Sequence, residues 1–293
     1  MSAALNEPRA IGVAPGVTLH YQEAGQGAPL VLIHGLTGDL GSWGGQMPVF
    51  AQTYRTISYS RRFSRPNRND LSASPGHSVW VEADDLAGLL DALDASPAIL
   101  VGSSFGAYVA LALAMTHPEK VRALVLSEPP VFDWADQVPG GAALRERYVQ
   151  DVLVPSRAAF DRGDDWAAQM IYARFVMGQD ALDQLPDAVR ERRFSNVDPI
   201  KALALSRHEN LPLNVAALAQ IKAPTLFMSG AQTQPLFAAV FQAAQTLLPQ
   251  AQFHQVADSG HSVYREQTDV FNALTLAFLA RHGPASCHGL KMG

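Results

Sequence analysis

Two short stretches of the chain carry residue types that together perform nucleophilic catalysis. The first, Gly102-Ser103-Ser104-Phe105-Gly106, follows a fully apolar segment and precedes a segment rich in Ala and Leu. A serine on a tight strand-to-helix turn exposes its hydroxyl, and N–H groups at the helix start face a developing negative charge. We therefore predict that Ser104 is a nucleophile, since Ser103 stands one place early in the pattern. The alternative is a glycine-bounded turn whose serine only caps a helix.

The second stretch, Ser259-Gly260-His261, supplies a candidate general base. It follows the last apolar run, 253–256, and precedes a helical pattern. Histidine takes up and returns a proton near neutral pH, as the partner of a serine nucleophile must. We predict that His261 is this base. His254 and His208 are interpreted as structural.

Strands and helices must bring these two stretches together. Short apolar runs predict strands at 17–24, 29–33, 55–59, 98–101, 123–126, 224–228 and 253–256. Helical spacing of apolar residues predicts helices at 78–93, 107–115, 236–247 and 270–279. The alternation indicates an α/β fold with a mostly parallel sheet covered by helices on both faces. Sites in such sheets lie beyond the C-terminal ends of the strands, where Ser104 and His261 fall.

The alternation of strands and helices is interrupted in the middle of the chain. Residues 132–212 show helical patterns and no clear strand. We predict one core domain, 1–131 and 213–282, with 132–212 inserted as a helical cap over the strand ends and 283–293 as a loose tail. The residues predicted to line a substrate pocket beneath this cap are Trp134, Met170, Tyr172, Phe175 and, from the core, Val263.

Composition excludes several classes of function. The formal net charge is -5 and no long basic run is present, which disfavours binding to nucleic acid or to an anionic membrane. The single cysteine, Cys287, allows neither an intrachain disulfide nor a cysteine-based metal site. The spacing of His, Asp and Glu suggests no metal, and we expect no cofactor. The oligomeric state is not predicted.

The sequence shows no pattern typical of a secretory signal or a membrane span. The first residues lack a basic stretch followed by an apolar core, and no apolar run approaches the length of a membrane span. We therefore expect a soluble, cytoplasmic protein. One basic cluster is interpreted as a solvated loop because Pro66 and Asn67 interrupt it. It consists of Arg61, Arg62, Arg65 and Arg68.

With these motifs in this order, the chain from Val17 to His282 resembles the α/β-hydrolase superfamily. Three motifs carry the resemblance: His34-Gly35-Leu36 after a strand, the turn around Ser104, and Ser259-Gly260-His261 after the last strand. The resemblance implies an oxyanion hole formed by the backbone N–H groups of Leu36 and Phe105. It also implies that the insertion is the lid of this family and that His34 braces its loop.

The position of the triad acid departs from the commonest pattern of the superfamily. The acid usually follows the strand that ends here at Met228-Ser229-Gly230, but residues 231–235 contain no carboxylate. Some members carry the acid one strand earlier, where this chain has Glu128. We predict that Glu128 orients His261, with Asp133 and Asp258 as weaker alternatives.

A serine nucleophile implies acyl transfer: attack on a carbonyl, an acyl-enzyme, and then water. The expected substrates are carboxylic esters or lactones of moderately apolar small molecules. A cofactor-independent lyase or dioxygenase on the same fold stays open as an alternative, as does a non-enzymatic sensor of a small ligand. Covalent labelling of Ser104 by a serine-directed organophosphorus probe distinguishes the first alternative. Thermal stabilisation by a ligand that is never turned over indicates the second.

Overall fold

The computed structural model describes residues 7–73, 76–178, 194–206 and 221–282, with 183–184, 186–187, 191 and 218 between them. The predicted tail, 283–293, and the predicted end of the insertion at 212 lie outside these residues. In the described part of the chain, no helix is both long and apolar enough to cross a membrane.

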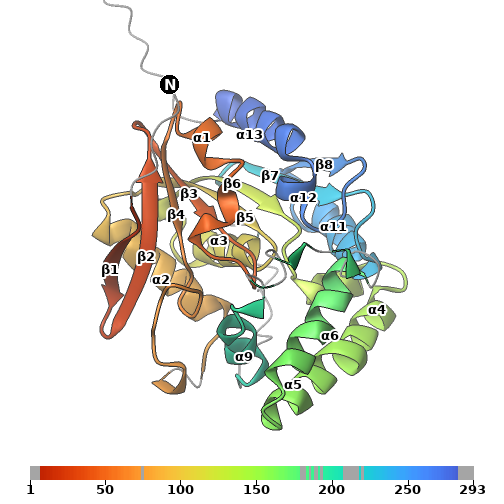
Figure 1. Cartoon of the computed structure of the whole chain (residues 1–293). Coiled ribbons are helices and arrows are strands. Elements are labelled where there is room, and N and C mark those ends of the chain that lie inside the picture. The colour runs from red at the N-terminus through yellow and green to blue at the C-terminus, as the bar shows by residue number, and fades with distance from the viewer. Residues whose placement is uncertain are drawn as a thin grey trace, which may run out of the picture.

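A single eight-stranded sheet runs through the molecule, in the order β1-β2-β4-β3-β5-β6-β7-β8 (Figure 1). Its strands are β1 (Arg9–Ala14), β2 (Val17–Ala24), β3 (Pro29–Ile33), β4 (Arg55–Tyr59), β5 (Ala98–Ser103), β6 (Val121–Ser127), β7 (Thr225–Gly230) and β8 (Gln252–Val256). β1 and β2 are antiparallel to each other, and β2 is antiparallel to β4. All other neighbouring pairs are parallel.

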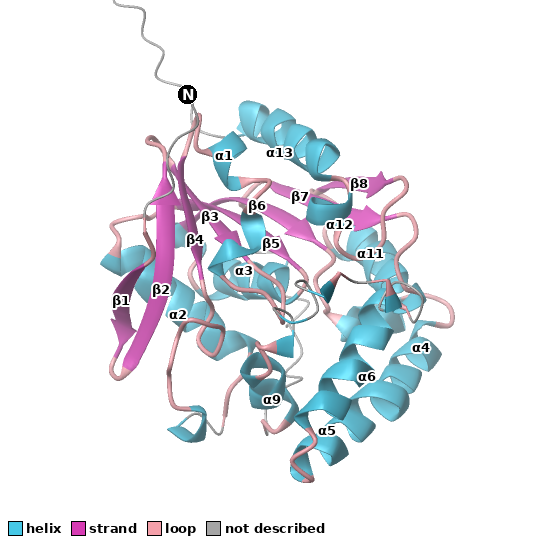
Figure 2. Cartoon of the chain, in the orientation of Figure 1, coloured by secondary structure: helices cyan, strands magenta, loops and turns pink. Residues whose placement is uncertain are grey.

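Helices follow the strands and cover the sheet (Figure 2). The α-helices of the core are α1 (Met47–Phe50), α2 (Val79–Ala92), α3 (Phe105–Thr116), α11 (Pro235–Leu247), α12 (Val263–Glu266) and α13 (Thr268–His282). Short 3-10 turns lie at Leu40–Trp43, Leu71–Ala73 and Pro118–Lys120.

The predicted insertion, residues 132–212, is helical in its described part. It holds a 3-10 turn (Phe132–Gln137), α4 (Gly141–Tyr148), a π-helical turn (Val149–Leu153), α5 (Val154–Asp161), α6 (Asp165–Met177) and α9 (Asp198–Ala204). In Figure 1, α4, α5 and α6 form a group beyond one end of the sheet. A small hydrophobic cluster, which includes Phe160 and Ile200, joins α5, α6 and α9.

The central strands are apolar throughout because both faces of the sheet are buried. Along β3, Val31 and Ile33 pack into the core beneath α2, α3 and α11. The alternating Leu30 and Leu32 pack into the opposite core with α1 and α13. This two-sided burial explains why the strands read as continuous apolar runs, as parallel sheets require.

Candidate active site

Ser104 occupies the turn between β5 and α3. Its backbone has φ +53° and ψ −126°, a conformation that L residues rarely adopt. Gly106 makes the turn possible, because a Cβ on this residue would lie 2.1 Å from the carbonyl oxygen of Ile33. The strained turn lifts the Ser104 side chain out of the sheet and into a cavity.

His261 and Glu128 form a buried hydrogen-bonded pair. His261 Nδ1 lies 2.7 Å from Glu128 Oε2. The two residues are 8% and 3% exposed. His261 lines the same cavity as Ser104, and the ring of Phe237 packs at 4.2 Å from its own ring, centroid to centroid. With Nδ1 engaged by the carboxylate, Nε2 is the nitrogen left for the nucleophile.

The carboxylate of Glu128 accepts three further hydrogen bonds, from the end of β7 and from the loop that follows it. Oε1 accepts from the Ser229 hydroxyl at 2.7 Å and from the Gly230 N–H at 2.9 Å. Oε2 also accepts from the Thr233 hydroxyl at 2.6 Å. The end of β7 and the loop after it therefore contain no acid, but they hold Glu128, the acid that directly follows β6. Sequence reasoning found Glu128 and missed the role of Thr233, since a hydroxyl in a loop carries no distinctive signal.

The loop that carries His261 is braced by Glu266. Its carboxylate accepts from the backbone N–H groups of Gly260 and, at 3.1 Å, Ser262. It also lies 3.4 Å from the Ser259 hydroxyl. Asp258, the weaker alternative for the acid, has a left-handed backbone (φ +50°), and its carbonyl oxygen accepts from Gln267. Asp133, the other alternative, lies 3.7 Å from Arg145.

The Gly35–Leu36 peptide lies beside Ser104. A Cβ on Gly35 would be only 3.2 Å from Ser104 Cβ. The Gly35 carbonyl oxygen accepts from His34 Nδ1 at 2.7 Å and from the Gly38 N–H at 3.0 Å. A trans peptide points its N–H away from its C=O. Fixing the Gly35 carbonyl therefore fixes the direction of the Leu36 N–H, one of the two predicted oxyanion donors.

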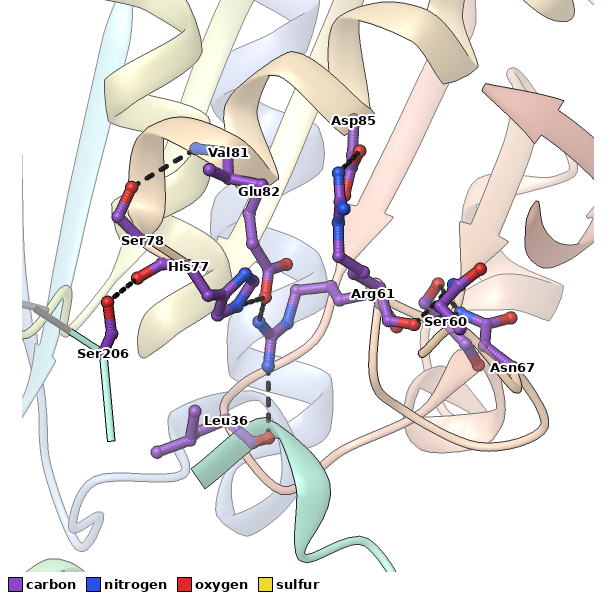
Figure 3. Close-up of polar contacts among 12 residues, drawn as sticks. Leu36, Ser60, Arg61, Asn67, His77, Ser78, Val81, Glu82, Asp85 and Ser206 are labelled. Atoms are coloured by element: carbon purple, nitrogen blue, oxygen red, sulfur yellow. Dashed lines mark hydrogen bonds and ion pairs between the residues drawn. The ribbon is translucent and has the colours of Figure 1, made fainter. Parts of the chain in front are cut away.

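Arg61 also holds this loop, and Figure 3 draws its contact with the Leu36 carbonyl oxygen. Its guanidinium donates to the carbonyl oxygens of His34 at 3.2 Å, Gly35 at 3.3 Å and Leu36 at 3.1 Å. Its Cζ lies 4.9 Å from the ring centroid of Phe105, the residue predicted to supply the second oxyanion donor. One side chain thus contacts both halves of the predicted oxyanion hole.

The interpretation of Arg61 as part of a solvated loop is wrong. The side chain is fully buried and pairs at 2.6 Å with Glu82 of α2, which also contacts His77 at 3.1 Å. Burial alone would raise the pKa of Glu82, but Arg61 and His77 outweigh it and lower the pKa to about 2. The neighbouring Arg62 pairs with Asp85 at 2.6 Å. Two carboxylates on α2 thus turn Arg61 and Arg62 inward, a partnership that loop composition does not reveal, whereas Arg65 and Arg68 are exposed.

His34 is neutral in this arrangement. Its Nε2 accepts the backbone N–H of Arg61 at 3.0 Å, while Nδ1 faces the Gly35 carbonyl oxygen. Burial and the nearby Arg61 charge lower the pKa of His34 to about 3. The side chain therefore braces the loop, the role that the resemblance implied for it.

A cavity of about 430 Å³ opens beside Ser104 and His261, a size that suits a small organic substrate. Leu36 lines it from the core, and Tyr172 and Val176 from α6 line it from the insertion. Of the five residues predicted to line the pocket, Tyr172 is the one that does so in the described structure. Missed lining residues include Gln169, Phe194 and Ile200.

The other four predicted pocket residues lie elsewhere. Trp134 and Val263 are buried in the two cores on either side of the sheet. Phe175 packs among Phe132, Tyr148 and Phe237. Met170 is half-buried on α6 and is not among the cavity-lining residues. Residue type alone does not separate an aromatic core residue from a pocket residue.

Within the described residues, no group of three His, Cys, Asp or Glu side chains is arranged to hold a metal.

Comparison with known proteins agrees with this architecture. The chain is 29% identical to a 2-hydroxymuconate semialdehyde hydrolase of Pseudomonas sp., over 98% of this chain and 99% of that protein. An N-acyl homoserine lactone degrading enzyme shares the fold at a TM-score of 0.73 and 23% identity, covering 92% of this chain and all of that one. An enol-lactonase of Burkholderia xenovorans shares the fold at a TM-score of 0.71 and 20% identity, covering 92% of this chain and 99% of that one.

These two solved structures establish the fold alone, and the curated relative is named as a hydrolase. The model of the alpha/beta hydrolase fold family matches residues 28–267, the greater part of the chain. The protein belongs to the α/β-hydrolase fold family.

Proposed function

We propose that the protein is a serine hydrolase that cleaves carboxylic esters or lactones of small, moderately apolar molecules through an acyl-enzyme. One observation carries the proposal: a strained, cavity-facing Ser104 shares its cavity with a His261 that a buried Glu128 holds by Nδ1. This is the arrangement of a nucleophile, a base and an orienting acid.

The proposed reaction has two halves. Ser104 Oγ attacks the substrate carbonyl while His261 Nε2 takes its proton, and the N–H groups of Leu36 and Phe105 receive the charge on the carbonyl oxygen. The C–O bond to the alcohol breaks, and the alcohol leaves with the proton from His261. Water then attacks the acyl-enzyme with the help of the same base, which releases the acid and restores Ser104. Glu128 stabilises the imidazolium that forms in each half.

The cavity supports a small and partly apolar substrate. Its walls combine aliphatic and aromatic side chains from α6 and α9 with the loop of residues 35–38, which we call the oxyanion loop. Relatives are named after a semialdehyde, an acyl homoserine lactone and an enol-lactone, so family membership leaves the acyl group open.

The test is a panel of esters and lactones of graded chain length, run on the wild type and on Ser104→Ala. We expect Ser104→Ala to lose at least about a thousandfold in kcat while it stays folded. A fluorophosphonate probe should label the wild type at Ser104 and leave the variant unlabelled. If the probe labels Ser104 and no ester or lactone is cleaved, the proposed chemistry is wrong. A variant with near-wild-type rates would remove Ser104 as the nucleophile.

A further inference from the structure

The cavity that holds the proposed catalytic residues also carries a guanidinium group. Arg265 lines it on the side of the His261 loop. Among the described lining residues, Arg265 is the one Lys, Arg, Asp or Glu. The apolar part of the wall comes from Leu36, Ala173, Val176, Phe194 and Ile200.

The guanidinium of Arg265 is anchored to a rigid base. Its Nη2 donates to the Tyr264 hydroxyl at 2.9 Å, and its Cζ lies 5.4 Å from the centroid of that ring. Tyr264 is itself buried, with its ring 4.4 Å from the ring of Trp43 and 6.4 Å from that of Phe271, centroid to centroid. An arginine held in this way loses less conformational entropy on binding an anion than a free surface arginine does.

No carboxylate in the described part of the chain forms an ion pair with Arg265. The nearest acid in sequence, Glu266, directs its oxygens to the N–H groups of Gly260 and Ser262. A guanidinium has five N–H donors, and the contact with Tyr264 uses one. The reaction proposed above gives Arg265 no role. Its side chain is exposed, so its remaining donors are accessible to an anion in the cavity.

We propose that Arg265 is the subsite for a free carboxylate carried by the substrate, away from the bond that is cleaved. This inference rests on the proposed function and narrows it to esters or lactones of small molecules that also bear an acid group. A planar guanidinium matches a carboxylate through two parallel hydrogen bonds. The apolar part of the cavity wall suits the aliphatic or unsaturated chain that joins the two functional groups.

The experiment compares matched pairs of esters. In one pair the carboxylate is on the acyl side, as in the para-nitrophenyl monoester of glutaric acid, and an isopropyl group replaces it in the neutral partner. In the other pair the carboxylate is on the alcohol side. We expect the wild type to prefer the anionic member of at least one pair. In Arg265→Gln the ratio of kcat/KM, anionic over neutral, should fall about tenfold, a modest factor because water screens a partly exposed charge.

Two control variants locate the effect. Arg265→Lys keeps the charge without the fork and should retain part of the preference. Arg281→Gln removes an exposed charge of α13 that contacts Gln252, so it should leave the preference unchanged. Equal loss for anionic and neutral esters in Arg265→Gln would mean a structural role and would overturn the subsite. So would a wild type without preference in either pair.

Failure of the proposed function gives a different result. In that case the wild type cleaves no member of either pair. Calorimetric titration of the uncleaved anionic esters into Ser104→Ala then tests the subsite alone. Binding that disappears in Ser104→Ala/Arg265→Gln supports the carboxylate subsite, and binding that persists there refutes it.

Discussion

Replacing Glu128 by Gln should invert the tautomer of His261, because the structure allows the new amide only one orientation. In the first orientation, the NH₂ group takes the place of Oε1 and meets the Gly230 N–H, a donor that cannot become an acceptor. In the second, it takes the place of Oε2 and meets the Thr233 hydroxyl and His261 Nδ1. Both of these groups can accept a hydrogen bond, so the second orientation is preferred.

In that orientation Nδ1 accepts a hydrogen bond and the proton of neutral His261 sits on Nε2, the nitrogen to which the proposed mechanism assigns the proton of Ser104. The ring then cannot take the proton of Ser104. The change also removes the charge that stabilises the imidazolium. The corresponding change of acid to amide in a serine protease triad costs about 10⁴ in kcat. We expect a loss on the order of 10³ to 10⁴, equivalent to about 4 to 5.5 kcal/mol of transition-state stabilisation.

Two measurements test this reasoning. Steady-state kinetics with any ester cleaved by the wild type gives the loss in kcat, and ¹⁵N NMR of His261 reports which ring nitrogen carries the proton. Thr233→Val is the matched control, because it removes one hydrogen bond to the carboxylate and leaves the charge. It should cost about tenfold or less. A Glu128→Gln protein that keeps more than about a tenth of the wild-type kcat, or that holds its proton on Nδ1, would refute the argument.

Two further predictions concern the support of the oxyanion loop. Arg61→Lys keeps a charge opposite Glu82 but cannot span the three carbonyl oxygens that Arg61 holds. It should lower kcat about tenfold to a hundredfold with little change in KM, and an unchanged kcat would contradict the role. The second prediction concerns acid stability, since the pKa of His34 is about 3 in the folded chain and 6.5 is its ordinary value. Below pH 6.5 the unfolded chain therefore binds a proton that the folded chain does not, and the free energy of unfolding falls. Between pH 7 and pH 5 this single group should contribute about 2 kcal/mol of that loss. Urea unfolding of the wild type and of His34→Asn at both pH values measures it, and equal losses in the two proteins would exclude His34 as the cause.

The apolar pattern predicts seven of the eight strands, and it is clearest for β3 and β5, whose residues are buried on both faces of the sheet. β6, expected at 123–126, extends over Val121–Ser127, and β7, expected at 224–228, extends over Thr225–Gly230. β1 was missed, and it is an edge strand whose residues are exposed or half-buried. Pairing with β2 and packing against α2, rather than local apolar pattern, define it.

Prediction of the candidate site divides along similar lines. Ser104 and His261 stand in local patterns that the fold demands, and the structure brings both to one cavity. The inward turn of Arg61 depends on Glu82, a residue 21 positions away on another element. Local sequence shows the arginine but not its partner. A buried ion pair of this kind is a tertiary contact, so the chain has to be folded before it can be seen.

Glu128, which follows β6, can take the place of an acid after β7 because the two strands are neighbours in the sheet and their ends are in register. Ser127 pairs with Met228, and the Glu128 N–H donates to the Met228 carbonyl oxygen at 3.1 Å, so Glu128 lies beside the start of the usual acid loop. Its left-handed backbone (φ +50°) is a strained conformation for a residue with a side chain. The hydrogen bonds from Ser229, Gly230 and Thr233 accompany this strain and hold the carboxylate on His261. An acid on one strand and its donors on the next therefore form a single unit, and returning the acid to the loop after β7 would require both to change together.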